Sequence, residues 1–326
     1  MGRALNASAP GFLLLGFSEF PRLRPTLFLL LLAAHLATVA GNLLILASVA
    51  AAPRRPPMLL FLGQLSAIEL GYTLVVAPRA LADLAAPGPA RGRPISLVAC
   101  AMQMQLFVAL GGAECFLLAA MAYDRYVAIC HPLRYPAVMT PALCARLALA
   151  CGLGGLAVSL ELVAGVFRLP FCRPRLLVHF FCDITALLHL ACTRGYADEL
   201  PLLGACLLLL LLPAALILAS YSALAAALRR LRVPGGRRKA AATCASHLDV
   251  TFLHYGCATF MYVRPKASYA PRSDRTLALV YTSVTPLLYP LIYSLRNREV
   301  TTGLRRALAW RRWPSRALGQ AVGSEP

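Results

Sequence analysis

Two acidic side chains lie deep inside apolar stretches of this chain. Glu69 is in the stretch of residues 59–81, and Glu114 is in that of residues 100–121. Two carboxyl groups in one water-free site repel each other unless they hold a proton or a cation, and an ionisable side chain in a membrane segment is a functional candidate by default. We therefore expect Glu69 and Glu114, with the amide of Asn42, to form a site for a proton or a sodium ion. The alternative is a neutral carboxyl group that is hydrogen-bonded to backbone.

Asp124, Arg125 and Tyr126 follow one another where the third long apolar stretch ends. A guanidinium group stays charged in every protein environment and offers planar donors. An Arg125–Asp124 pair can therefore act as a switch, because breaking the pair frees the guanidinium for another partner. The alternative is an arginine that reaches along its helix to the membrane surface.

Four of the eleven cysteines fall on one predicted side of the membrane. They are Cys100, Cys172, Cys182 and Cys192. Disulfides persist in extracellular surroundings, and four thiols allow three pairings, which the spacing leaves open. The alternative for this cluster is a zinc site, which would need histidine partners.

The six histidines give no catalytic pattern. They are His35, His131, His179, His189, His247 and His254, at different depths and on different sides of the expected bundle. No nucleophile–base spacing and no metal-binding motif emerges from them. We therefore expect no enzyme and no bound metal other than the sodium ion considered above.

These residues must be positioned by helices that cross a membrane. The chain has 326 residues, of which 59% are hydrophobic and only 14% charged, and its mean hydropathy is +0.68. A soluble domain cannot bury so much apolar surface, whereas a helix of about 20 apolar residues spans a bilayer. Seven such runs cover residues 27–49, 59–81, 100–121, 143–166, 200–224, 241–262 and 277–293. The sequence therefore predicts an all-α membrane protein with a bundle of seven transmembrane helices.

The predicted organisation has three parts. Residues 1–26 form an extracellular segment, residues 27–293 form the bundle, and residues 294–326 form a cytoplasmic tail. Within that tail, residues 298–310 are basic on one side and apolar on the other, which is typical of a helix that lies along a membrane surface.

The basic residues favour one orientation. The net charge is +19, but these residues are confined to short segments between apolar runs, which argues against a nucleic-acid partner. With the N-terminus outside, 18 of the 32 Lys and Arg residues fall in the inner segments, as the positive-inside rule expects. Asn6 begins a glycosylation sequon in the polar N-terminus. We expect a multi-pass plasma-membrane protein, in contact with lipid, with an extracellular N-terminus and a cytoplasmic C-terminus.

Three segments resemble one known family. Residues 121–131, Met-Ala-Tyr-Asp-Arg-Tyr-Val-Ala-Ile-Cys-His, resemble the third-helix signature of olfactory receptors, a branch of the rhodopsin-like G-protein-coupled receptors. Residues 239–248 resemble the segment that opens helix six in that family, and residues 286–297 resemble the end of its helix seven. Tyr123 is similar to the class II, or tetrapod, type. The chain departs from the family at Tyr289, where asparagine is usual.

The resemblance implies an odorant receptor. The expected ligand is a small, uncharged, mostly apolar volatile molecule bound within the bundle. The expected partner is the heterotrimeric olfactory stimulatory G protein, which raises cyclic AMP. The resemblance also implies disulfides between Cys100 and Cys182 and between Cys172 and Cys192.

The resemblance further assigns residues to switching and to ligand binding. Those for switching and G-protein coupling are Asp124, Arg125, Tyr126, Tyr221, Lys239, Tyr289, Pro290 and Tyr293. Those for ligand binding are Met104, Phe107, Val108, Gly111, Gly112, Leu202, Ala205, Cys206, Leu209, Tyr255, Ala258, Thr259, Tyr262, Leu279 and Thr282. Phe107 stands where receptors for amines keep a carboxylate, so an amine ligand is not expected.

Two other functions fit parts of the sequence. The buried carboxyl groups could mark an ion path, but transporters usually carry internal repeats, and none is visible here. Alternatively, the chain is a receptor-like protein with impaired signalling, because Tyr289 replaces an amide that helps to hold the polar pocket and the helix kink.

Overall fold

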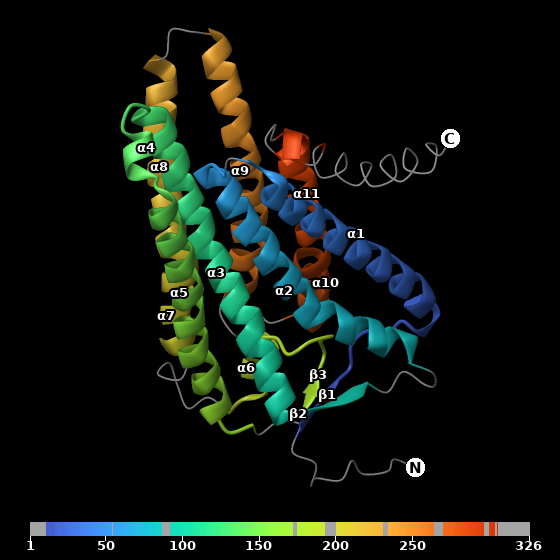
Figure 1. Ribbon diagram of the computed structural model, residues 1–326. Helices are drawn as coiled ribbons and strands as arrows, with labels where there is room; N and C mark the ends of the chain where they lie inside the picture. The colour runs from blue at the N-terminus through green and yellow to red at the C-terminus, as the bar shows by residue number, and fades with distance from the viewer. Residues whose placement is uncertain are drawn as a thin grey trace, which may run out of the picture.

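The structure is a computed structural model that describes residues 11–53, 55–86, 92–171, 175–192, 200–230, 234–263, 270–296, 300–303 and 305. Its long helices run beside one another as a bundle, with a small sheet at one end (Figure 1). We call this the cap end. The opposite end carries the short helix α4 (Tyr135–Val138), and we call it the switch end.

Each predicted apolar run lies within a helical segment that extends beyond it on at least one side. These segments are α1 (Arg24–Ala51), α2 (Pro57–Ala85), α3 (Leu97–Cys130), α5 (Pro141–Arg168), α7 (Leu200–Cys206) with η3 (Leu207–Leu211) and α8 (Leu212–Arg230), α9 (Pro234–Tyr262), and α10 (Pro271–Leu279) with η5 (Val280–Val284) and α11 (Thr285–Arg296). Within the described residues, all of them except α9 are apolar and long enough to cross a membrane. With α9, which has 29 residues, they form the seven-helix bundle.

The helix starts follow ordinary capping chemistry. The hydroxyl of Ser96 accepts a hydrogen bond from the backbone of Ala99 at the start of α3 (3.1 Å). The hydroxyl of Thr140 does the same for Leu143 in α5 (3.2 Å). Such contacts satisfy backbone donors that have no partner in the first turn.

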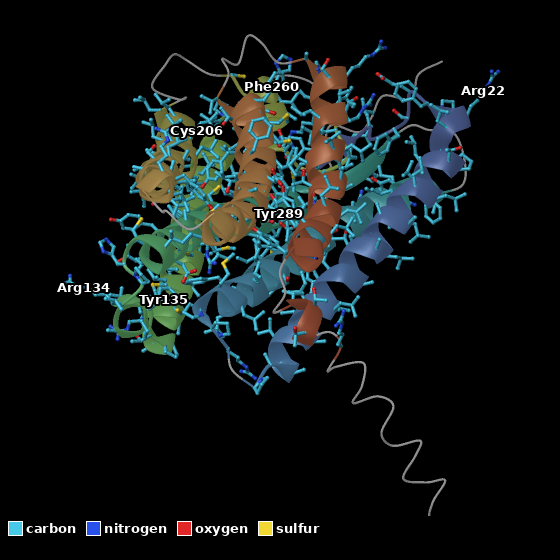
Figure 2. The ribbon with its side chains drawn as sticks, turned by 90° about the horizontal axis from the view of Figure 1, so that it is seen from above. Arg22, Arg134, Tyr135, Cys206, Phe260 and Tyr289 are labelled. Carbon is cyan, nitrogen blue, oxygen red and sulfur yellow. A yellow bond between two sulfur atoms is a disulfide. The ribbon has the colours of Figure 1, made fainter. Side chains whose placement is uncertain are left out.

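The outer surface of the bundle is apolar. Large side chains such as Leu218, Phe252 and Phe260 are 68%, 78% and 64% exposed, and Figure 2 shows the ring of Phe260 at the edge of the bundle, away from Tyr289 in its middle. A soluble protein rarely exposes so many large apolar groups side by side. This surface therefore matches a lipid environment.

Small residues set how closely some helices approach. A Cβ atom on Gly155 of α5 would lie 2.5 Å from both the carbonyl oxygen of Ala109 and the amide nitrogen of Ala113 in α3. Glycine at this position therefore lets the two backbones pack in direct contact. Gly41 of α1 faces the ring of Pro290 in α11. A Cβ atom on Gly41 would lie 2.8 Å from the Cβ atom of Pro290.

Three short strands form the sheet at the cap end. The central strand β1 (Gly11–Leu14) pairs antiparallel with β2 (Arg93–Ser96) and parallel with β3 (Leu176–Leu177). The short helix α6 (Ile184–Leu190) follows β3 in the same loop. We call the sheet, α6 and the loop between them the cap.

A disulfide links the cap to the bundle, and a buried arginine links the segment after β1 to the bundle. Cys182 of the cap and Cys100 of α3 form a disulfide, the first of the two pairs that the resemblance implies. Arg275 of α10, which is only 3% exposed, donates hydrogen bonds to the carbonyl of Gly16 (2.6 Å) and to the carboxylate of Glu19 (3.0 Å). The segment after β1 is thus fixed to the seventh span.

The predicted amphipathic helix at residues 298–310 is described only in part. Residues 300–303 are helical and Val300 is buried. The rest of that prediction, apart from residue 305, lies outside the described residues.

Candidate ligand cavity and switch

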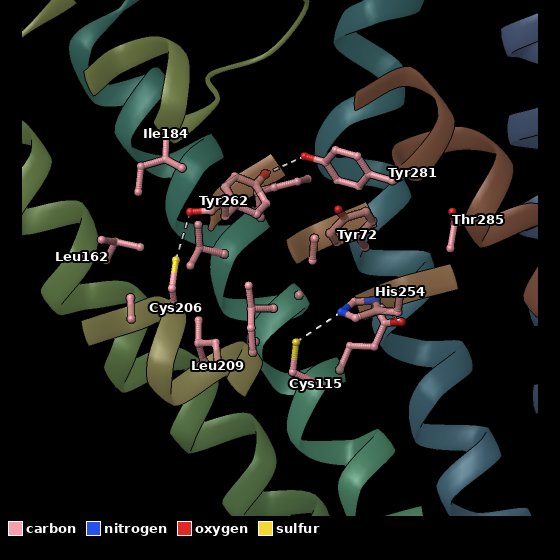
Figure 3. Close-up of a pocket in the computed structure, with 18 of the residues that line it drawn as sticks. Tyr72, Cys115, Leu162, Ile184, Cys206, Leu209, His254, Tyr262, Tyr281 and Thr285 are labelled. Carbon is pink, nitrogen blue, oxygen red and sulfur yellow. Dashed lines mark hydrogen bonds and ion pairs between the residues drawn. The ribbon is translucent and has the colours of Figure 1, made fainter. Parts of the chain in front are cut away.

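A cavity of about 100 Å³ lies inside the bundle, below the cap (Figure 3). It is lined by Glu69, Tyr72, Phe107, Val108, Gly111, Gly112, Glu114, Cys115, Leu162, Ile184, Leu202, Ala205, Cys206, Leu209, Leu210, His254, Ala258, Tyr262, Tyr281, Thr285, Pro286 and Tyr289. Most of these groups are apolar, with Tyr262 and Tyr281 on the side of the cap and His254 and Glu114 on the opposite side (Figure 3). The cavity therefore has an apolar middle between a polar roof and a polar floor.

Ten of the fifteen predicted ligand residues line this cavity. They are Phe107, Val108, Gly111, Gly112, Leu202, Ala205, Cys206, Leu209, Ala258 and Tyr262. The two π-helical segments contribute as well, through Leu209 and Leu210 of η3 and Tyr281 of η5. A π-helical turn shifts the helix register by one residue and is frequent at functional sites.

Thr259 does not line this cavity. Its side chain is exposed on the outer face of α9, because successive helix residues are rotated by about 100° and the neighbouring Ala258 already points into the cavity.

Four other predicted ligand residues do not line the cavity either. Met104 is fully buried below the cap, and Tyr255 donates from its hydroxyl to the carbonyl of Cys115 (2.7 Å). Thr282 donates to the carbonyl of Ala278 in its own helix (2.7 Å), and Leu279 is half-buried one turn away from the cavity wall.

The roof of the cavity is a hydrogen-bonded group that joins the cap to two spans. The hydroxyl of Tyr262 in α9 donates to the carboxylate of Asp183 (3.0 Å) and lies 2.6 Å from the hydroxyl of Tyr281 in η5. Asp183 also caps α6, accepting from the backbone and hydroxyl of Thr185 and from the backbone of Ala186. These hydrogen bonds therefore connect α9 and η5 to the cap.

The floor of the cavity brings together charged and polar groups from four helices. Nδ1 of His254 in α9 lies 2.8 Å from a carboxylate oxygen of Glu114 in α3. Nε2 of the same ring lies 3.2 Å from the sulfur of Cys115 (Figure 3). Glu69 of α2 and Tyr289 of α11 line the same cavity, together with Glu114. The two predicted carboxyl groups thus form the bottom of the ligand cavity.

Asn42 does not join this group. Its amide donates to the carbonyl of Thr38, one turn earlier in α1 (3.0 Å), and it is not among the residues that line the cavity. The expectation that its amide completes the carboxyl site is therefore wrong.

His254 is a site residue that the sequence pattern did not reveal. It is one of six scattered histidines, and its contact with Glu114 exists only because α3 and α9 pack together. The sequence feature that could have identified His254 is its spacing from two predicted pocket residues. His254, Ala258 and Tyr262 are four residues apart and so share one face of a helix, and the last two were predicted to line the pocket.

At the switch end, Asp124 and Arg125 form a salt bridge with an N–O distance of 2.6 Å. The Asp124 side chain is completely buried, and its second oxygen accepts a hydrogen bond from the hydroxyl of Tyr135 in α4 (2.8 Å). Tyr126 points elsewhere and contacts His131 (3.2 Å). The predicted Arg125–Asp124 pair is thus present, with a third member from the neighbouring loop.

Tyr221 of α8 is engaged with α9. Its hydroxyl lies 2.9 Å from Nδ1 of His247, whose Nε2 lies 3.1 Å from the carbonyl of Leu118 in α3. Three spans therefore meet next to Arg125. Lys239 lies in α9, but its side chain is outside the described residues.

Tyr289 and Tyr293 fill the space between the cavity floor and this switch. They are 1% and 3% exposed, and neither hydroxyl has a well-formed hydrogen bond. Pro290 lies between them inside α11. Figure 2 shows Tyr289 in the middle of the bundle, and the same residue lines the cavity.

Two further predictions concern residues near the cap. Cys192 is disulfide-bonded, while Cys172, its expected partner, lies outside the described residues, as does Asn6. Within the part of the chain that the structure describes, no group of three or more His, Cys, Asp or Glu side chains is arranged to hold a metal ion.

Comparisons with known proteins agree with this architecture. A family model described as olfactory receptor matches residues 31–311. Human olfactory receptor 10AC1 is 76% identical over 98% of this chain and 97% of its own length. Human olfactory receptors 10R2 and 10C1 are 43% and 46% identical, each over 91% of this chain and over 88% and 94% of their own lengths.

The chain belongs to the olfactory receptor family. It is a multi-pass membrane receptor of the G-protein-coupled class and not an enzyme. The cavity beneath the cap and the Arg125–Asp124 pair are its candidate sites for odorant binding and for signalling.

Proposed function

We propose that this odorant receptor binds a small, uncharged, mostly apolar volatile molecule in the cavity below the cap and activates the olfactory stimulatory G protein, which raises cyclic AMP. The observation that carries the proposal is one continuous cavity wall that begins at Tyr262 under the cap and ends at Tyr289 above the switch. A ligand in this cavity touches α9 and α11 together. Ligand contacts and helix positions are therefore physically linked.

The size and lining of the cavity support this class of ligand. Its volume of about 100 Å³ is smaller than an apolar cavity of ~150 Å³ that holds benzene, so only a small molecule enters without side-chain movement. The middle of the cavity offers carbon atoms from Phe107, Leu209 and Ala258. The carboxyl group of Glu114 is already paired with His254, so it is not available to an amine.

The proposed orientation places the cap outside the cell. Disulfides persist outside the reducing cytoplasm, and Cys100 and Cys182 are bonded at the cap end. The switch end, with Arg125 and Tyr221, then faces the cytoplasm and the G protein. Glycosylation at Asn6 and the basic inner segments agree with this orientation.

Cyclic AMP in cells that express this chain with the olfactory G protein tests the proposal. Across a broad odorant panel, we expect a dose-dependent rise for at least one small uncharged odorant. An Arg125→Ala variant at equal surface level should lose that response, because it lacks the guanidinium that is released on activation. A response that persists in this variant would show that the switch is elsewhere.

A second candidate is a receptor that binds odorants but signals poorly. The observation that favours it is the bulky ring of Tyr289 at a position where the family usually has asparagine, with a buried hydroxyl that lacks a well-formed hydrogen bond. Tyr289→Asn separates the two candidates. If the native receptor is silent on the panel and Tyr289→Asn responds, this side chain limits signalling.

A further inference from the structure

The cavity floor contains two carboxyl groups but also its own basic side chain. Sodium is bound in proteins mainly by oxygen atoms, and two adjacent carboxyl groups without a counter-charge would favour such a cation. Here, however, the ring of His254 lies against Glu114, with Nδ1 2.8 Å from a carboxylate oxygen. A nitrogen donor thus occupies the position that a cation would take beside this carboxylate.

We propose that His254 serves as a built-in cation for the Glu69–Glu114 site, so that this receptor binds a proton there and does not bind sodium. The proposal concerns the polar floor alone. It does not depend on which odorant the cavity accepts or on which G protein the receptor activates.

The balance of charge supports this assignment. Isolated charges are costly in a buried site, and a pair with good geometry is tolerated. One imidazolium on His254, one carboxylate on Glu114 and one neutral carboxyl group on Glu69 sum to zero. None of the described residues that line the cavity is Lys, Arg or Asp, so a sodium ion would either add a net charge or require Glu69 to ionise.

The neighbouring oxygen donors support the same conclusion. Asn42, whose amide oxygen could serve as a ligand, is not among the described residues that line the cavity. Tyr289 brings a buried ring to the place where the family usually offers an asparagine amide, and its hydroxyl supplies a single neutral oxygen. The Tyr289 ring therefore leaves less room, and one amide oxygen fewer, for a metal ion at the cavity floor.

The thermal stability of the purified full-length receptor in sodium chloride and in choline chloride, at equal ionic strength, tests the proposal. For the native chain we expect the same unfolding temperature in both salts at every concentration. In His254→Phe the two carboxyl groups lose their counter-charge, so sodium should bind. The unfolding temperature should then rise in sodium chloride alone, saturably and by about 2–6 °C.

Two control variants make this result specific. His35→Phe removes another histidine from a membrane helix, one whose Nδ1 contacts the hydroxyl of Thr73 (3.1 Å) and no carboxylate. We expect no gain of sodium response from it. The double variant His254→Phe with Glu114→Gln removes the proposed acceptor as well and should lose the response of the single variant.

Each result decides for or against the proposal. A saturable stabilisation of the native receptor by sodium would overturn it, as would a folded His254→Phe variant without any sodium response. If that variant does not fold, a second measurement tests the proposal. It compares how much the native receptor and Glu114→Gln broaden the ²³Na resonance. We expect no difference, and a broadening lost in Glu114→Gln contradicts the proposal. None of these measurements uses an odorant or cyclic AMP, so their failure is distinguishable from failure of the proposed function.

Discussion

Asp124 is the most constrained side chain at the switch end. It has no exposed surface, and its two oxygens are bonded to Arg125 of the same helix and to Tyr135 of α4. A buried charge that loses one partner is strongly destabilised. The Arg125–Asp124 pair is therefore held by α4 as well as by α3 itself.

Tyr135→Phe should raise basal cyclic AMP. The variant removes one hydrogen bond to a charged group, worth about 1.5–3 kcal/mol, and so weakens the hold on the Arg125–Asp124 pair. We expect roughly a tenfold shift toward the active state, measured without odorant at matched surface expression. Tyr123→Phe is the control, since Tyr123 of α3 is 41% exposed and is not among the hydrogen-bond partners of Asp124. Equal basal activity in both variants would contradict a role for Tyr135.

Ala258→Leu should weaken every agonist that uses the cavity. The added carbon atoms point into a space of about 100 Å³, and we expect a loss of potency of at least about tenfold, or ~1.4 kcal/mol. The readout is the cyclic AMP dose–response curve. Thr259→Leu places the same leucine side chain on the exposed face of the same helix and should leave potency unchanged. A loss in Thr259→Leu alone would place the ligand elsewhere.

At the scale of elements, the packing of α5 on α3 fixes the geometry of the cavity wall. Gly155 of α5 faces Gly112 of α3, which lines the cavity, and the Cβ of a side chain at 112 would lie 3.2 Å from the Cα atom of Gly155. The wall therefore has no spare space at this crossing.

Gly155→Ala should destabilise the bundle even though the change is a single methyl group. Its Cβ would overlap backbone atoms of α3 at 2.5 Å, and such overpacking costs about 1–3 kcal/mol. We expect a lower unfolding temperature and reduced surface expression. Gly152→Ala, three residues earlier with nothing within 4 Å, should be neutral or slightly stabilising, because alanine favours helix by about 0.5–1 kcal/mol. Similar losses in both variants would argue against a close α3–α5 contact.

The cap contains a buried histidine whose charge state should affect stability. His179 lies between Phe180 and Phe181, and both of its ring nitrogens are buried without a hydrogen bond. Burial lowers the pKa of His179 below its usual 6.5. The charges of Asp183 and Asp274 oppose this shift, and that of Arg275 adds to it.

The receptor should therefore lose stability as the pH falls below 6.5. In that range the unfolded chain binds a proton at His179 and the folded chain does not, so protonation favours unfolding. Thermal unfolding of the native chain and of His179→Phe at about pH 7.5 and about pH 5.5 measures the effect. The native chain should lose more stability than the variant. An equal loss would mean that His179 makes no contribution.

At the scale of the whole molecule, the spans were predictable and their contacts were not. Each run of apolar residues must cross the bilayer as a helix, so the seven spans followed from composition alone. It was harder to predict which face of each helix points into the bundle. Thr259 was assigned inward by resemblance, yet α9 turns it toward lipid. The His254–Glu114 pair depends on how two distant spans pack, which no local pattern encodes.

The central place of β1 in the cap has a consequence for biosynthesis. This strand leaves the ribosome before either of its partners, β2 and β3, because it precedes them in the chain. It must wait unpaired until α5 has been inserted and residues 176–177 have reached the same side of the membrane. The earliest segment to be made is therefore among the last to be placed. We therefore expect an epitope tag fused close to residue 11 to interfere with maturation.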